Sequence, residues 1–363
     1  MTAIALPARA RILVVTLRRL GDVLLSTPLI RSLRRALPEA NITALVFAGT
    51  EGILAGNPDL DALEVAPARR SAGETLALAR RLWRRYDLAI STHSGDRPMF
   101  FAWAAARRRI GPVEPAGFSA RLERFTFERV VSADHGIHRV DDVLRLADAM
   151  GIARVPQVVN PAGRVGADAR PARPYAVIHA GPMFRYKRWT VEGWRALAAA
   201  LARRGLDLIA TGGPAPEERR YLDEVWGTAD CPVRRLDGQL SWPALAATIG
   251  GAQVYVGPDT SVTHLAAASG CPTVALYGPT DPRIWGPWPA GGLDRPWEKA
   301  GTVQRRGNVW LVQNSLPCMP CQLEGCDRHI GSRSQCLDEM SVRQVLGAVE
   351  EALAAPMDRR VPA

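Results

Sequence analysis

Short apolar runs alternate with longer stretches of helical periodicity along most of the chain. In the first half, a run at residues 11–17 is followed by apolar positions at helical spacing from Val23 to Leu37, which Pro38 ends. Further strand-like runs occur at residues 41–47, 175–179, 206–210, 252–256 and 273–277. Strands that alternate with helices predict parallel sheets covered on both faces, which is an α/β fold.

A stretch at residues 156–174 interrupts this alternation. It is rich in Pro, Ala, Gly and Arg and has no clear period, whereas an amphipathic helix is predicted just before it at 140–150. The 363 residues are enough for two domains that each have their own core. We therefore predict a first domain at residues 1–165 and a second at residues 166–363.

The turn after the run at 252–256 carries polar side chains. Asp259, Thr260 and Ser261 are residues that cap helices, and a compact helix is predicted at 262–269. The free N–H groups and dipole of a helix N-terminus suit an anion such as a diphosphate, and open α/β sheets bind ligands at this end of their strands. An ordinary βαβ unit, in which Asp259 only caps and His264 only packs, explains the spacing equally well.

Two other turns carry candidate chemistry. Asp22 lies in the turn after the first strand, where it can cap a helix or act as a base. That turn lacks both the G-x-G-x-x-G pattern and a P-loop lysine, which argues against a dinucleotide or NTPase site. Lys187 is one of only two lysines against 44 arginines. Its compact ammonium suits a diphosphate leaving group, and the alternative is a surface lysine beside the packed Trp189.

Four segments in order resemble glycosyltransferase family 9, the bacterial lipopolysaccharide heptosyltransferases. They are the turn Gly21-Asp22-Val23, the motif Lys187-Arg-Trp189, the loop Thr211–Glu218, and the stretch from Asp259 through His264 to Tyr277-Gly-Pro-Thr-Asp-Pro282. The resemblance runs from Arg11 to about Leu353. It implies the GT-B fold, in which two Rossmann-like domains with parallel sheets face each other across a cleft. It also implies that the last helix, about 341–354, packs back on the first domain.

The resemblance implies an inverting transfer of heptose from ADP-heptose to a hydroxyl of the lipopolysaccharide inner core. Asp22 matches the proposed catalytic base of the family, and Lys187 matches its phosphate-binding lysine. The family's donor site maps onto Glu217 for the ribose hydroxyls, the backbone of 236–241 for the adenine, and Asp259, Thr260, Ser261 and His264. No cofactor is expected. No catalytic metal is expected either, because the chain has no Asp-x-Asp motif of the kind that metal-dependent transferases use.

Positive charge is concentrated in the first half of the chain. Residues 1–165 contain 24 arginines against 16 acidic residues, an excess of eight, whereas the remainder has 22 basic and 20 acidic residues. A basic half suggests a polyanionic partner. No nucleic-acid motif is found, so the anionic lipopolysaccharide core fits better. The candidates for acceptor binding are Arg18, Arg19, Arg97 and the run Arg107–Arg109, although arginine runs are also common on solvated surfaces.

No segment approaches the ~18 to 20 apolar residues of a membrane-spanning helix, and the first residues lack the features of a signal peptide. We expect a cytoplasmic protein that contacts the inner leaflet of the inner membrane through its basic surface. Trp83, Phe100, Phe101 and Trp103 could assist that contact, but packing in the core is the expected role.

Four cysteines, Cys318, Cys321, Cys326 and Cys336, occur within one loop rich in proline and charge. In a reducing compartment this spacing favours a zinc or iron–sulfur site over disulfides, although its second half is irregular. A structural metal is therefore an open alternative. Two alternatives also remain for the function: a transferase of the same family for another nucleotide sugar or glycan, and a non-catalytic polyanion-binding protein.

Overall fold

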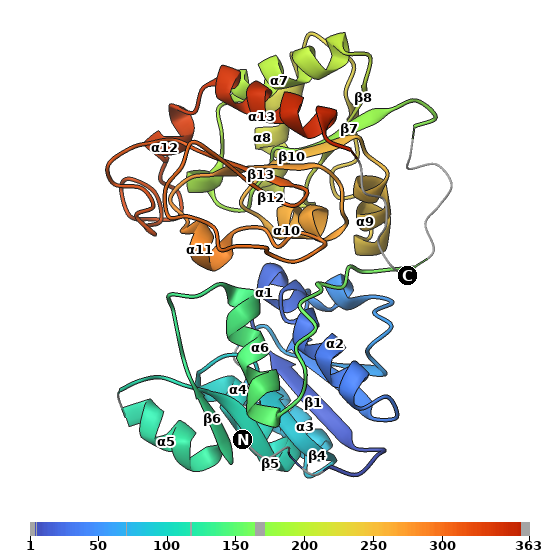
Figure 1. The fold of residues 1–363 in the computed structure, drawn as a ribbon, viewed down its shortest axis with the longest axis vertical. Coiled ribbons are helices and arrows are strands. Elements are labelled where there is room, and N and C mark those ends of the chain that lie inside the picture. Colours follow the sequence, from blue (N-terminus) through green and yellow to red (C-terminus); the bar gives the residue numbers. More distant parts are fainter. Residues whose placement is uncertain (1–3, 5, 70, 117, 164–170, 357–363) are drawn as a thin grey trace. The chain divides into compact units, whose positions relative to one another are not determined.

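The computed structural model describes residues 4, 6–69, 71–116, 118–163 and 171–356 (Figure 1). The chain forms two compact units, a first unit at residues 1–161 and a second unit at residues 162–363. The predicted domain boundary, between residues 165 and 166, lies outside the described residues.

The first unit contains a six-stranded parallel sheet in the order β3-β2-β1-β4-β5-β6. Its strands are β1 (Arg11–Thr16), β2 (Asn41–Phe47), β3 (Ala62–Ala66), β4 (Tyr86–Ser91), β5 (Ala106–Val113) and β6 (Arg129–Ser132). The order runs outward in one direction from β1 and in the other from β4. The sheet therefore has a topological switch point between β1 and β4, where open α/β sheets bind ligands beyond the strand ends.

Helices connect these strands. They are α1 (Leu20–Leu24), α2 (Thr27–Ala36), η1 (Glu51–Leu54), α3 (Ala72–Leu82), α4 (Asp96–Ala105), α5 (Phe118–Thr126) and α6 (Arg139–Met150). The single helix predicted at 23–37 is divided into α1 and α2. Pro28 has no N–H to offer the carbonyl of Leu24, and the Thr27 hydroxyl donates to that carbonyl at 2.7 Å instead.

Both faces of the first sheet are buried. Ile12 and Val14 of β1 pack in one apolar cluster with α2 and α6, whereas Leu13 and Val15 pack in another with α3 and α4. This alternation follows from the period of two residues in a strand. It explains why the strand is apolar throughout rather than alternating with polar residues.

The second unit contains a seven-stranded sheet in the order β12-β13-β11-β10-β7-β8-β9. Its strands are β7 (Tyr175–His179), β8 (Asp207–Thr211), β9 (Arg234–Arg235), β10 (Val254–Pro258), β11 (Thr273–Tyr277), β12 (Val303–Arg306) and β13 (Val309–Gln313). All neighbours are parallel except β12, which is antiparallel to β13. The switch point of this sheet lies between β7 and β10. The predicted α/β class with mostly parallel sheets is confirmed.

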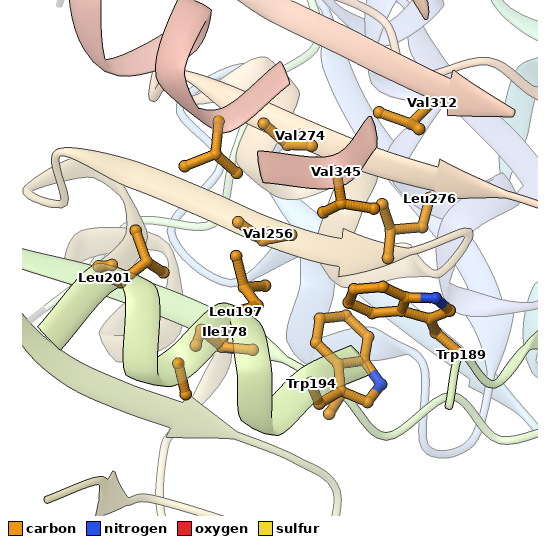
Figure 2. Packing of buried hydrophobic residues seen from close by; sticks show 14 of the residues in the cluster. Ile178, Trp189, Trp194, Leu197, Leu201, Val256, Val274, Leu276, Val312 and Val345 are labelled. Carbon is orange, nitrogen blue, oxygen red and sulfur yellow. The ribbon is translucent and has the colours of Figure 1, made fainter. Parts of the chain in front are cut away.

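The helices of the second unit are η2 (Arg185–Lys187), α7 (Val191–Arg203), α8 (Pro216–Trp226), α9 (Trp242–Gly250), α10 (Ser261–Ala268), α11 (Pro282–Trp285), α12 (Gln335–Asp338) and α13 (Val342–Ala354). Figure 2 shows the core between the sheet and two of them, where Val345 of α13 lies beside Leu276 of β11 and Leu197 of α7 lies beside Val256 of β10. The buried side chains of α13 thus pack on the sheet of the second unit. The expectation that the last helix packs back on the first domain stays a prediction.

Candidate functional site

Each sheet carries a cluster of buried polar side chains just beyond its switch point. In the second unit, Lys187 follows β7, Asp259 follows β10 and Thr280 follows β11, and these three strands are neighbours in the sheet. Lys187 Nζ donates to Asp259 Oδ2 at 2.5 Å, and the Thr280 hydroxyl donates to the same oxygen at 2.6 Å. The parallel topology therefore brings together residues that are up to 93 positions apart, Lys187 and Thr280.

This pair is largely removed from water. The side chain of Asp259 is 8% exposed and that of Lys187 is 21% exposed. Burial raises the pKa of the Asp259 carboxyl, but the Lys187 ammonium, His264 and two hydrogen bonds outweigh it, so the pKa is lowered overall. The aspartate therefore stays ionised and holds the ammonium in place.

The motif that follows Lys187 fixes its position. Trp189 is 1% exposed, packs edge-on against Trp194 with ring centroids 5.1 Å apart, and donates from Nε1 to the Met340 carbonyl at 2.9 Å. Figure 2 shows both indoles in the core of the second unit. An anchored residue two positions after Lys187 limits how far the lysine backbone can move. The alternative, a surface lysine beside the packed Trp189, describes the tryptophan, but the Lys187 side chain is only 21% exposed and is paired with Asp259.

The helix α10 begins beside the pair. Thr260 is its N-cap, and the Thr260 hydroxyl accepts from the Thr263 N–H at 3.4 Å, while Ser261 is the first helical residue. Asp259 is not the cap, because its carboxylate is bound by Lys187 and Thr280. A helix start next to a buried cation can hold an anion through free N–H groups and charge.

His264 of α10 is 5% exposed, and its Nδ1 has no hydrogen-bond partner within the described part of the chain. Burial lowers the pKa of His264 to about 4. The Asp259 carboxylate raises this pKa, and the Lys187 ammonium lowers it. The ring is therefore neutral at physiological pH. A buried ring nitrogen without a partner is costly, which is an argument that something in the loaded site supplies one.

The structure separates two adjacent glutamates at the start of α8. Glu217, the residue aligned with the family's ribose-binding glutamate, is exposed to solvent. Glu218 instead turns into the loops that follow β7 and β8, where its Oε1 accepts from the Gly213 N–H at 2.5 Å. A Cβ added at Gly181 would lie 2.8 Å from Glu218 Oε1, so the glycine leaves room for the Glu218 side chain beside this loop. Glu218 is therefore a site residue that the sequence analysis did not select.

The segment 236–241, expected beside the adenine, lies next to these loops. The Gly238 N–H donates to the Gly212 carbonyl at 2.7 Å, and Ser241 caps α9. The loops after β7, β8, β9, β10 and β11 thus contribute to one edge of the second sheet.

The polar cluster of the first unit surrounds Asp22. This residue lies in the first turn of α1, directly after β1, and is 8% exposed. Its Oδ1 lies 3.7 Å from Arg18 Nη1 and 3.7 Å from Arg139 Nε. Both of these distances are too long for hydrogen bonds, and Asp22 Oδ1 and Arg139 Nε have no hydrogen-bond partner among the described residues. Asp22 is also not the N-cap of α1, which is Arg19.

Arg139 was not selected from the sequence, although it is the most deeply buried cation of this cluster. Its side chain is 8% exposed, its Nη1 donates to Asp142 Oδ2 at 2.9 Å, and its Nη2 donates to the Thr92 carbonyl at 2.9 Å. Burial lowers the pKa of Arg139, while Asp22 and Asp142 raise it. The guanidinium is thus held rigidly beside the Asp22 carboxylate, and no local sequence signal marks it.

His93, at the end of β4, completes this cluster. Burial, together with repulsion from Arg18 and Arg139, lowers the pKa of His93 to about 3. Its Nδ1 lies 3.4 Å from the Thr92 hydroxyl, which in turn lies 3.0 Å from the Thr16 hydroxyl of β1. The C-terminal ends of β1 and β4, the two strands at the switch point, therefore meet in a network of polar groups.

The arginines predicted for acceptor binding do not all lie near Asp22. Arg18 and Arg19 lie in the turn before α1 and are exposed, so they remain candidates. Arg97 lies at the start of α4, but its Nη2 donates to the Pro67 carbonyl at 2.7 Å and its guanidinium stacks 4.8 Å from the Phe47 ring. The run 107–109 was wrongly placed. It lies at the start of β5, level with the start of β1, and thus at the opposite edge of the sheet.

The aromatic residues expected in the core of the first domain are divided. Phe101 is fully buried, but Trp83, Phe100 and Trp103 are 50%, 36% and 41% exposed. Within the described part of the chain, no helix is long and apolar enough to cross a membrane.

The four loop cysteines are free thiols. Burial raises the pKa of Cys336 to about 12, with contributions from the nearby Cys321, Cys326 and Cys318. Across the described ranges, no group of three or more His, Cys, Asp or Glu side chains is placed to hold a metal ion. The sequence does contain the spacing Asp59-Leu-Asp61, but these carboxylates are paired with Arg31 and Arg34.

Comparisons with known proteins agree with this arrangement. A family model described as "Glycosyltransferase family 9 (heptosyltransferase)" matches residues 75–292, more than half of the chain. Lipopolysaccharide heptosyltransferase 3 of Escherichia coli is 29% identical over 285 residues, which cover 74% of this chain and 83% of that protein. Lipopolysaccharide heptosyltransferase 1 of Pseudomonas aeruginosa is 29% identical over 377 residues, which cover 95% and 99% of the two chains.

Among solved structures, a glycosyl transferase family 9 protein from Veillonella parvula has a TM-score of 0.78 at 22% identity, covering 97% of this chain and 99% of that one. This likeness over nearly the full length confirms the predicted fold class, GT-B with two Rossmann-like domains.

Proposed function

The chain belongs to glycosyltransferase family 9, the heptosyltransferase family, and we propose that it transfers heptose from ADP-heptose to a hydroxyl of the lipopolysaccharide inner core. The single observation that carries this proposal is the buried Lys187–Asp259 pair at the start of α10. We infer that it forms an anion site at the switch point of the second sheet. The relatives are lipopolysaccharide heptosyltransferases, which supports heptose as the transferred sugar and lipopolysaccharide as the acceptor.

The second unit binds the donor in this proposal. The Lys187 ammonium and the free N–H groups of α10 hold the diphosphate, and Thr260 and Ser261 lie at the same helix start. His264 lines the pocket, where a donor atom can hydrogen-bond to its unpartnered Nδ1. We place the ribose hydroxyls against Glu218 rather than Glu217, because only the carboxylate of Glu218 turns into the loops that follow β7 and β8.

The first unit binds the acceptor and carries the base. Asp22 takes the proton of the acceptor hydroxyl as that oxygen attacks the anomeric carbon of the heptose. The bond between this carbon and the diphosphate oxygen breaks on the opposite face, so the anomeric configuration inverts. ADP leaves with its developing charge offset by Lys187. Arg139 positions the Asp22 carboxylate, and Arg18 and Arg19 contact the anionic core sugars.

The proposed reaction uses no metal ion and no cofactor. The charge that a divalent cation supplies to a diphosphate in other transferases comes here from a lysine and a helix start. The carboxylates of Asp59 and Asp61 have the spacing of a metal-binding motif, but Arg31 and Arg34 neutralise them. We further propose that the protein works in the cytoplasm at the inner leaflet of the inner membrane, where its acceptor is anchored.

The decisive experiment measures ADP release by the full chain with a heptose-free lipopolysaccharide core as the acceptor. We expect turnover with ADP-heptose that exceeds turnover with ADP-glucose or a UDP-sugar, that persists in EDTA, and that yields an inverted linkage by NMR. A panel of cores truncated after the first and second heptose would identify the acceptor hydroxyl. Preference for another nucleotide sugar would move the chain to another transfer reaction, and no release with any donor would leave a polyanion-binding protein.

A further inference from the structure

An exposed aromatic cluster lies on the first unit, away from Asp22. Trp83 follows α3, and Phe100 and Trp103 lie on α4. The rings of Trp83 and Trp103 meet edge to face with centroids 5.2 Å apart, and those of Phe100 and Trp103 stack at 6.3 Å. These side chains contact each other while each keeps more than a third of its surface exposed. Contiguous exposed aromatic surface of this kind marks an interaction site.

An arginine lies beside both indoles. The guanidinium carbon of Arg84 lies 5.0 Å from the Trp83 ring and 5.7 Å from the Trp103 ring. Its Nη1 donates to the Ala106 carbonyl at 2.7 Å, and its backbone N–H donates to the Ala104 carbonyl at 2.9 Å. Arg84 has a φ of 53°, which is unfavourable for a residue with a Cβ. The cluster is therefore a fixed arrangement rather than a set of loose surface side chains.

The surroundings of this cluster are strongly basic. Residues 80–85 and 106–109 contain seven arginines and no acidic residue. Arg81 pairs with Glu64 and Arg108 pairs with Glu128. Arg80, Arg85 and Arg107 are exposed and lie more than 4 Å from every carboxylate of the described residues. The local excess of positive charge is therefore not neutralised by the protein itself.

A pocket of about 290 Å³ opens beside the cluster. Arg84, Arg107 and Arg108 line it, together with Tyr86, Asp87 and the apolar pair Leu6 and Pro7. The Asp87 carboxylate is already engaged, because its Oδ2 accepts from the Arg11 N–H at 2.8 Å. Arg84 and Arg108 already bind the Ala106 carbonyl and Glu128, so Arg107 is the guanidinium of this pocket that can bind the phosphate of a headgroup.

This surface belongs to the N-terminal edge of the first sheet. Arg84 lies two residues before β4, and Arg107 and Arg108 lie in the first half of β5, whereas Asp22 follows the end of β1. The strands are parallel, so their starts and their ends lie at opposite edges of the sheet. The cluster is therefore separate from the proposed acceptor site.

We propose that Trp83, Phe100 and Trp103, with Arg80, Arg84, Arg85 and Arg107, form a docking surface for an anionic phospholipid bilayer. Indole rings favour the headgroup level of a membrane, and arginines are drawn to the negative potential of an anionic leaflet. A second copy of the chain is a poorer occupant, because like charges would then face each other. The inference deepens the proposed function, since an acceptor anchored in a membrane requires the enzyme to work at that surface.

Flotation of the full chain with vesicles tests the docking surface. We expect binding to vesicles of phosphatidylcholine with about 30% phosphatidylglycerol, little binding to phosphatidylcholine alone, and release by high salt because of charge screening. The variants W83A/W103A and R80Q/R85Q/R107Q should each lower the partition coefficient by about tenfold or more. Exposed Phe125 of α5 provides the aromatic control F125A, and R203Q/R220Q/R343Q in the second unit matches the loss of charge.

Each outcome decides the inference. Wild-type binding by the surface variants, or equal losses in the control variants, would overturn it. Failure of the wild-type protein to bind anionic vesicles would also overturn it. If W83A/W103A instead converts a dimer to a monomer in sedimentation equilibrium, the surface joins copies of the chain. The variant W83F/W103F should retain most of the binding and guards against misfolding. Vesicle binding needs no donor, so failure of the transfer reaction would leave this result standing. Turnover of W83A/W103A on a deacylated, soluble acceptor should match that of the wild type.

Discussion

The two sheets each place a buried aspartate beside a cation at the switch point, but they hold it differently. Asp259 of the second unit is bound by Lys187 Nζ at 2.5 Å and by the Thr280 hydroxyl at 2.6 Å. Asp22 of the first unit lies 3.7 Å from both Arg18 and Arg139, and its Oδ1 accepts no hydrogen bond from any described residue. An aspartate at the switch point thus accepts two hydrogen bonds at one oxygen in the second unit, whereas Asp22 Oδ1 accepts none in the first.

This difference indicates that the two aspartates have different roles in the proposed reaction. A carboxylate whose oxygen is held by two donors is a poor proton acceptor, and its effect is to fix the lysine that meets the leaving group. A carboxylate surrounded by positive charge but lacking a close donor keeps a lone pair available for a substrate proton. The contrast supports Asp22 as the base and Asp259 as a positioning residue. Replacing residues of the two sites one at a time tests it.

The largest effect is expected from Asp22→Asn. The amide keeps the size of the side chain but cannot take the proton, so kcat should fall by roughly 10² to 10⁴. ADP affinity, measured by calorimetry, should hardly change because the donor site lies in the second unit. Asp59→Asn removes another buried carboxylate of the same unit, which is paired with Arg31 at 2.8 Å, and serves as the control. Near-normal turnover of folded Asp22→Asn would reduce this residue to a first-turn acid of α1.

The next largest effect is expected from Lys187→Ala, at a cost of about 2 to 4 kcal/mol in transition-state stabilisation. Lys187→Arg should recover only part of this, since a planar fork does not replace a compact charge. Steady-state kinetics with varied donor gives both values. The other lysine of the chain, Lys299, is exposed, and Lys299→Ala should be silent. Unchanged kinetics for both Lys187 variants would move the phosphate site elsewhere.

A smaller effect concerns the histidines beside the two aspartates. The folded-state pKa is about 3 for His93 and about 4 for His264, both below the ordinary value of 6.5. As the pH falls below 6.5, the two histidines become protonated in the unfolded chain before they do in the folded protein. The free energy of unfolding is therefore highest above pH 6.5 and decreases as the pH falls from 6.5 toward 4. Each residue contributes a slope of up to about 1.4 kcal/mol per pH unit in that window.

Replacement of either histidine tests this slope. Denaturant unfolding of His93→Gln and of His264→Gln should each show a shallower fall of the free energy of unfolding between pH 6.5 and 4.5. His329→Gln changes an exposed ring and is the control. Slopes equal to that of the wild type in both variants would show that neither ring is held neutral.

The smallest effect is expected for the exposed arginines of the acceptor side. Arg18→Gln should raise the acceptor KM several-fold and leave the donor KM unchanged, and added salt should act in the same way. Arg97→Gln should do less, because its guanidinium already binds the Pro67 carbonyl and stacks on Phe47. Arg35→Gln, on the exposed last turn of α2, is the control. A fall in kcat larger than the rise in KM would assign Arg18 to the Asp22 carboxylate instead.

Sequence alone predicted the elements well where apolar runs end at sharp turns. The strands predicted at 41–47, 175–179 and 273–277 coincide with β2, β7 and β11. Parallel sheets buried on both faces require such continuous apolar runs, so the signal is strong. The motifs also placed Lys187 and Asp259 each after a strand, although only the structure shows that these strands are neighbours and that the two residues form a pair.

Other features could not be predicted because they depend on the direction in which a side chain points or on contacts between segments distant in the sequence. Glu217 and Glu218 differ by about 100° around the helix axis, and nothing local tells which one faces the glycine loops. Arg139 reaches Asp22 from 117 positions along the chain. The run 107–109 was chosen from its charge alone, and no strand was predicted at 106–113 to show that the run lies at the start of β5 rather than after its end.

The six residues of β1 also fix a length. A strand rises about 3.3 Å per residue, so some 20 Å separate the docking edge from the Asp22 edge of the first sheet. With the docking edge resting on a bilayer, Asp22 is held at that height above the headgroups. The sheet then acts as a spacer that selects acceptors by reach, since a sugar carried too close to the lipid or too far out on the glycan misses the base, whatever its chemistry.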